Sequence, residues 1–189
     1  SANENKPTIP PAPNGLPEKY KNDWELAHKG DAKAQFNLGG MYENGAGVTK
    51  DFAQAVIWYR KAAEQGHATA QFNLGVMYDE GQGVAKDEDQ AVYWYRKAAE
   101  QGYAQAQFEL GFMYQQGWGV TKDYGQAINW YRKAADQGHA SAQFNLGVMY
   151  AKGEGVTQDE DQAIFWIKRA AKQGHDIAQN ILKDMGLSW

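Results

Sequence analysis

Residues 32–66 have the sequence AKAQFNLGGMYENGAGVTKDFAQAVIWYRKAAEQG, and this stretch decides the fold. Close copies of it start at Ala68, Ala104 and Ala140, so the same pattern returns every 36 residues. A fixed period of this size is typical of stacked structural repeats rather than of a single globule. The sequence therefore predicts a repeat array.

Each copy contains two helical segments. In the first, over about 32–43, Ala34, Leu38 and Tyr42 have the i, i+4, i+8 spacing of one helix face. Glycines interrupt the pattern, and a second segment begins near Asp51. Asp51 and Gln54 have the spacing of a capping box, and Gly66 ends the segment. We name these segments helix A and helix B and predict an all-α chain.

The repeats set the domain boundaries. All five prolines lie in the first 17 residues, which predicts an extended leader without a packed core. A phenylalanine recurs at Phe36, Phe72, Phe108 and Phe144, whereas Asn180 takes this position in the last segment, as expected of a cap. The predicted parts are a leader (1–17), a half repeat (18–30), four repeats (31–66, 67–102, 103–138 and 139–174) and a capping helix (175–189).

Composition narrows the function classes. The formal net charge is −4 and the pI is about 5.6, which disfavours nucleic acid and anionic membranes as partners. The chain has no cysteine, so disulfides and thiol chemistry are excluded. No apolar run is long enough to cross a membrane, so we expect no membrane insertion.

The repeated pattern Ala-x-Ala-Gln-x-x-Leu-Gly-x-Met-Tyr, followed by Gly-x-Gly-Val, Trp-Tyr and Lys-Ala-Ala-x-Gln-Gly, resembles the Sel1-like repeat. The resemblance covers about 155 residues. It implies a right-handed α/α superhelical solenoid in which the A helices line the concave side. It also implies an adaptor or scaffold that binds proteins, since family members mostly act in this way.

Positions that differ between repeats point to the binding surface, because stacking explains the identical ones. On each helix A they lie opposite the face that carries Leu38 and Tyr42. The candidate partner-binding residues are Asn37, Asn73, Val76, Glu80, Glu109, Phe112, Gln116, Asn145 and Val148. The asparagines among them have the donor and acceptor groups to clamp a peptide backbone. The alternative is a ladder of solvated or intramolecularly bonded amides.

Apolar residues outside this set give further candidate contacts. Trp118 stands alone on a Gly-x-Gly loop, where it either contacts a partner or packs on Tyr124. Ile177 and Ile181 replace polar residues in the last segment, and Leu187 and Trp189 follow them. These four predict an end patch that binds a partner, pairs two solenoids or is covered by the chain's own tail.

These observations predict a non-catalytic scaffold with no cofactor and no metal. His67, His139 and His175 share one repeat position, for which we expect a structural role. The alternatives are an immunity protein or inhibitor of a bacterial effector toxin and, further off, a cell-wall hydrolase using Glu80 and Glu109. We expect a monomer or weak homodimer, in the periplasm or secreted, with the cytoplasm as the alternative.

Overall fold

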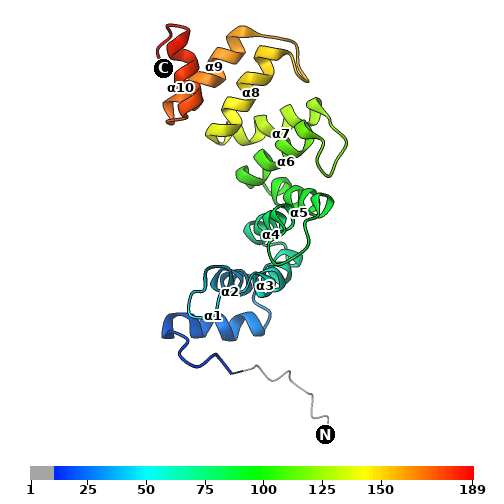
Figure 1. Cartoon of the computed structure of the whole chain (residues 1–189), viewed down its shortest axis with the longest axis vertical. Helices are drawn as coiled ribbons and strands as arrows, with labels where there is room; N and C mark the ends of the chain where they lie inside the picture. The colour runs from blue at the N-terminus through cyan, green and yellow to red at the C-terminus, as the bar shows by residue number, and fades with distance from the viewer. Residues whose placement is uncertain (1–10) are drawn as a thin grey trace. The chain divides into compact units, whose positions relative to one another are not determined.

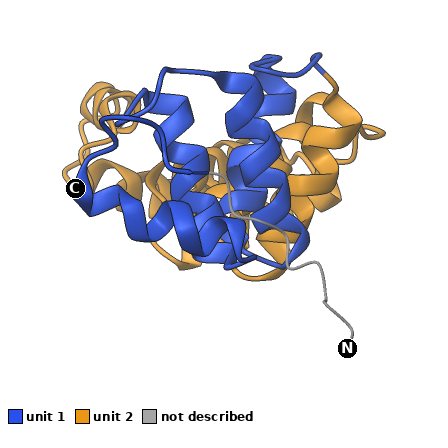
Figure 2. Ribbon diagram, turned by 90° about the horizontal axis from the view of Figure 1, so that it is seen from below, with its two compact units in different colours: residues 1–86 blue, residues 87–189 orange. Residues whose placement is uncertain are grey.

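The computed structural model describes residues 11–189, which form ten helices and no strand. The chain divides into two units, coloured separately in Figure 2. Unit 1, residues 1–86, contains α1 (Glu18–His28), α2 (Ala32–Asn44), α3 (Phe52–Glu64) and α4 (Ala68–Glu80). Unit 2, residues 87–189, contains α5 (Glu88–Glu100), α6 (Ala104–Gln116), α7 (Tyr124–Asp136), α8 (Ala140–Lys152), α9 (Glu160–Lys172) and α10 (Asp176–Asp184).

The helix boundaries follow the local signals in the sequence. Asp51 caps α3 by accepting a hydrogen bond from the Gln54 backbone N–H at 3.0 Å. In the four repeats, helix A ends at a left-handed glycine, as at Gly45 with φ 71°. The predicted helical pairs are confirmed, with the aspartate preceding helix B rather than beginning it. Asp87, Asp123 and Asp159 cap their helices in the same way.

In unit 1, helices that follow one another in sequence pack together (Figure 1). Leu38 of α2 and Tyr59 of α3 are almost completely buried. The leader departs from the prediction at Leu16, which is buried against Trp24 and Trp58. A turn that joins the Leu16 N–H to the Pro13 carbonyl brings this side chain onto the core. The preceding part of the predicted leader, residues 1–10, lies outside the described residues.

In unit 2, the same succession of helix pairs ends at α10 (Figure 1). Ala178 and Leu182 of α10 are fully buried in a cluster with Ile167, and Phe144 packs against this cluster. Asn180 is exposed. These contacts place α10 over the apolar face of the fourth repeat.

A glycine in the middle of each helix A allows a close approach by helix B. A Cβ atom built on Gly39 would lie 2.5 Å from a ring carbon of Tyr59. The ring of Tyr59 therefore occupies the space that a side chain at position 39 would need. Gly111 makes the equivalent contact with Tyr131.

Candidate binding surface

The predicted asparagine column contacts other residues of the same chain. Asn37 Nδ2 donates to Asp23 Oδ2 at 3.0 Å, which joins α2 to α1. Asn73 lies beside the Tyr59 hydroxyl, and Asn145 lies beside the Tyr131 hydroxyl. These contacts match the intramolecular alternative that the sequence left open. Because an amide has two donors and one carbonyl, each side chain keeps further hydrogen-bonding capacity.

The tyrosines in these contacts are anchored on both sides. The Tyr59 hydroxyl donates to Glu43, and the Tyr131 hydroxyl donates to Gln115 Oε1 at 2.8 Å. Burial raises the pKa of both tyrosines, and for Tyr59 the hydrogen bond to Glu43 raises the pKa further. Both phenols therefore stay protonated and serve as fixed donors beneath the face predicted to bind a partner.

The two glutamates of the candidate surface are each engaged by a glutamine of the same unit. Glu80 in unit 1 accepts a hydrogen bond from Gln82 Nε2 at 2.6 Å. Glu109 in unit 2 accepts one from Gln105 Nε2 at 2.8 Å. Gln116 is exposed, and Val76 and Val148 are half-buried. These contacts position the two carboxylates as hydrogen-bond acceptors.

Phe112 and Trp118 come together as an exposed aromatic pair. Their ring centroids lie 5.4 Å apart, and the rings are nearly perpendicular at 81°. The Trp118 side chain is 43% exposed, whereas Phe112 is half-buried against the core of unit 2. The sequence suggested Tyr124 as the intramolecular neighbour of Trp118. The sequence did not indicate the Phe112–Trp118 pair, because the pair forms only where the loop after α6 turns back over its own helix.

The predicted end patch is only partly open. Ile177 is 57% exposed and Trp189 is 43% exposed. Ile181 instead lines a cavity of about 420 Å³ with Ile164, Ile167 and Val148. The tail residue Leu187 packs on the terminal core, so the alternative of cover by the tail applies to part of the patch.

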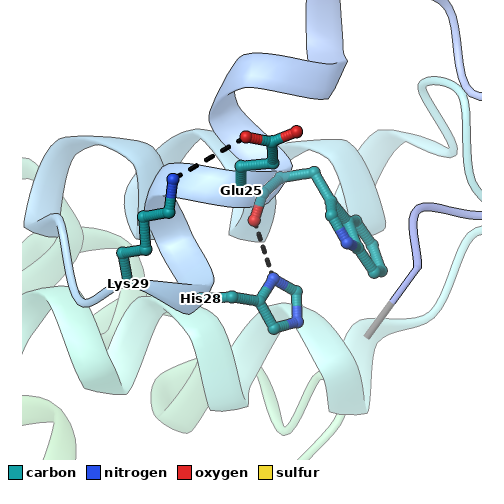
Figure 3. Close-up of polar contacts among 4 residues, drawn as sticks. Glu25, His28 and Lys29 are labelled. Carbon is teal, nitrogen blue, oxygen red and sulfur yellow. Dashed lines mark hydrogen bonds and ion pairs between the residues drawn. The ribbon is translucent and has the colours of Figure 1, made fainter. Parts of the chain in front are cut away.

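The histidines take structural positions. His67 Nδ1 accepts a hydrogen bond from the Ala70 N–H at the start of α4, and its ring stacks on Phe36 at 4.7 Å. His139 and His175 repeat this cap and stack in unit 2. Figure 3 shows His28, whose Nδ1 donates to the Trp24 carbonyl at 2.7 Å. The structural role expected of the first three is confirmed.

Residues 11–189 contain no cluster of histidine and acidic side chains arranged to hold a metal ion. Within the same range, none of the helices has the length and apolar composition needed to cross a bilayer.

The Sel1 repeat model matches residues 32–67, 68–103, 104–139 and 140–175. A comparison with curated proteins found no match. The solved structures similar to this chain include a protective antigen of uropathogenic Escherichia coli strains with an SLR fold. It is 43% identical, with a TM-score of 0.84 over 89% of this chain. A Sel1 repeat protein from Oxalobacter formigenes is 45% identical, with a TM-score of 0.75 over 85% of this chain.

The cysteine-rich protein B of Helicobacter pylori is more distant, with 26% identity and a TM-score of 0.56 over 70% of this chain. The chain spans 37% of the E. coli antigen and 65% of the Oxalobacter protein. The matches confirm the all-helical repeat solenoid expected from the sequence.

Proposed function

The chain belongs to the Sel1 repeat family, and from this membership we propose that it is a non-catalytic scaffold that binds a protein or peptide through the concave surface that its A helices line. Sel1-repeat proteins generally mediate protein–protein interactions. The candidate residues of this face differ between repeats, as expected where a partner rather than stacking sets the sequence.

The observation that carries the proposal is the Phe112–Trp118 pair. Tryptophan is enriched among residues that dominate binding energy, and such residues act in well-packed, desolvated pockets. Trp118 is largely exposed, yet its ring is held at a fixed angle by Phe112. A partner that covers this pair would bury apolar area at little cost in side-chain order. Glu109 and Gln116, on the same face of α6 as Phe112, supply polar contacts around it.

The test is a binding measurement on a partner recovered by affinity capture and identified by mass spectrometry. We expect Trp118→Ala to weaken binding about 30-fold or more, the equivalent of about 2 kcal/mol for a dominant contact. Phe112→Leu should weaken binding less, because it removes the ring but keeps an apolar side chain on the core. Titration calorimetry would measure both affinities, with melting curves to confirm folding.

Phe165→Ala is the matched control. Phe165 is 48% exposed and forms an edge-to-face pair with Trp166 at 5.1 Å, but it lies on a B helix, α9. Its removal should leave the affinity unchanged. Full affinity in the Trp118 variant would refute this surface and direct attention to Ile177 and Ile181.

A further inference from the structure

Where a repeat has tyrosine at the position of Tyr59, the ring fills the junction with the next repeat. Tyr59 and Tyr131 are at most 1% exposed and reach the asparagine of the following helix A. The equivalent position holds Asp23 at the first junction, between α1 and α2. This shorter side chain still contacts Asn37 but leaves space around it. A cavity of about 420 Å³ lies there, within the range of small-ligand sites.

Gly40 opens the same cavity from the side of α2. The equivalent residues in the later repeats are Val76, Phe112 and Val148. A Cβ atom on Gly40 would meet nothing closer than the Tyr59 hydroxyl at 3.6 Å, and its φ is not positive. Folding therefore does not require glycine here, although it costs about 1 kcal/mol relative to alanine in a helix. Because Gly40 has no side chain, the cavity beside it stays open.

The polar groups around the cavity are arranged as acceptors. Asn37 directs Nδ2 to Asp23 Oδ2, and Asn44 directs Nδ2 to the Gly40 carbonyl at 2.9 Å. The Asp23 carboxylate and the two amide carbonyls remain to receive donors. No lysine or arginine is among the residues that line the cavity, and the nearby Lys19 ammonium lies over the Tyr20 ring at 4.6 Å.

We propose that this cavity binds an arginine side chain of the partner protein. The guanidinium group is a planar cation with five donors, which suits several acceptors spread over two helices. It is also weakly hydrated, so it transfers readily to a site walled by Tyr20 and Phe36. A lysine ammonium is a strongly hydrated point charge and fits this arrangement less well. The proposal rests on the proposed function in taking the ligand to be part of a bound protein.

The test uses a short peptide, so it is independent of the natural partner. The full chain, labelled with ¹⁵N, is titrated with acetyl-Gly-Arg-Gly-amide at about 0.15 M salt. We expect saturable shifts of the Asn37 and Asn44 side-chain amide signals. A peptide with citrulline, which has the shape of arginine without its charge, should bind at least tenfold more weakly. A lysine peptide should also bind more weakly.

Two variants test the site itself. Gly40→Val, which introduces the residue of the second repeat, should abolish the saturable shifts. Asp23→Asn should weaken binding of the arginine peptide at least tenfold, while its amide oxygen still accepts the hydrogen bond from Asn37. This variant tests the site even if Gly40→Val does not fold. Glu64→Gln removes the same charge from an exposed side chain of α3 in unit 1 and should leave binding unchanged.

The proposal is overturned if the citrulline or lysine peptide binds as tightly as the arginine peptide. Equal losses of affinity in Asp23→Asn and Glu64→Gln would also overturn it, because the loss would then reflect net charge alone. Shifts confined to signals other than those of Asn37 and Asn44 would do the same. None of these outcomes bears on the Phe112–Trp118 surface, so the proposed function would stand.

Discussion

At each junction between repeats, one residue of helix B is paired with one residue of the following helix A. Asp23–Asn37 is separated by fourteen residues, and Tyr59–Asn73 and Tyr131–Asn145 have the same separation. At the last junction, Ile167 and Ile181 hold these two positions and line a cavity. The helix B residue and the helix A residue are therefore both polar at the first junction and both apolar at the last. Cavities open at the junctions where the helix B residue is shorter than tyrosine.

The half-buried histidine caps give a residue-scale prediction about pH. Burial lowers the pKa of His67 and of His139, and Lys33 adds a smaller effect at His67. Both histidines accept a helix N–H at Nδ1, which requires the neutral ring. Since the pKa is lower in the folded state, stability is fully present above the unfolded value of about 6.5. It is lost as the pH falls through the folded pKa.

We therefore expect the melting temperature to fall between pH 7.5 and pH 5. In the double variant His67→Asp, His139→Asp it should vary less over this range. Aspartate is the natural cap at the same position of the first repeat, where Asp31 Oδ1 accepts from the Ala34 N–H at 2.7 Å. Carboxylates titrate mainly below this window. An equally steep pH dependence in the double variant would show that other groups cause it.

Contacts between a loop and a helix end give the element-scale prediction. The loop between α6 and α7 docks on the start of α5, where a Cβ atom on Gly119 would overlap the backbone of Glu88. Gly138 also has positive φ, but a Cβ atom there finds no other heavy atom within 4 Å. We expect Gly138→Ala to lower the free energy of unfolding by about 1–2 kcal/mol, from backbone strain alone. Gly119→Ala should cost about 3 kcal/mol or more, because the loop must also move.

Urea unfolding of the two variants measures this difference within one unit. If Gly119→Ala and Gly138→Ala lowered the free energy of unfolding by similar amounts, backbone strain alone would explain both effects and the loop contact would be dispensable. Gly83 makes the corresponding contact with Phe52 in unit 1, so the same substitution there provides an independent repetition.

The helices could be predicted from the sequence because their signals are local. Asp51 and the glycine Gly45 act within one turn of the helix end that they define. The neighbours of exposed side chains could not be predicted in this way, since they depend on how helices and loops pack. The Asn73–Tyr59 contact and the Phe112–Trp118 pair could be found only from the fold. The fourteen-residue pairing was the one signal in the sequence that could have identified the asparagine contacts.

For the whole molecule, the closing helix α10 determines whether the last repeat stays covered. Each repeat in such an array is stabilised mainly by its neighbours, so the final one depends on its cap. Leu182 is completely buried, and Phe144 packs on the cluster that α10 completes. Removing residues 175–189 would expose this apolar surface, and we expect the shortened chain to melt earlier and to self-associate.

Two substitutions in α10 test the contribution of its packing without shortening the chain. Leu182→Ala should cost about 2–5 kcal/mol, as for a buried leucine, whereas Ile177→Ala should change stability by less than about 0.5 kcal/mol because its side chain is 57% exposed. Sedimentation velocity and melting curves would be recorded on the full chain, the shortened chain and both variants. The full chain should be monomeric or a weak dimer. If the shortened chain stayed monomeric and melted at the parent's temperature, α10 would have no capping role. If Ile177→Ala converted a dimer to a monomer, the exposed end of α10 would be a surface of self-association.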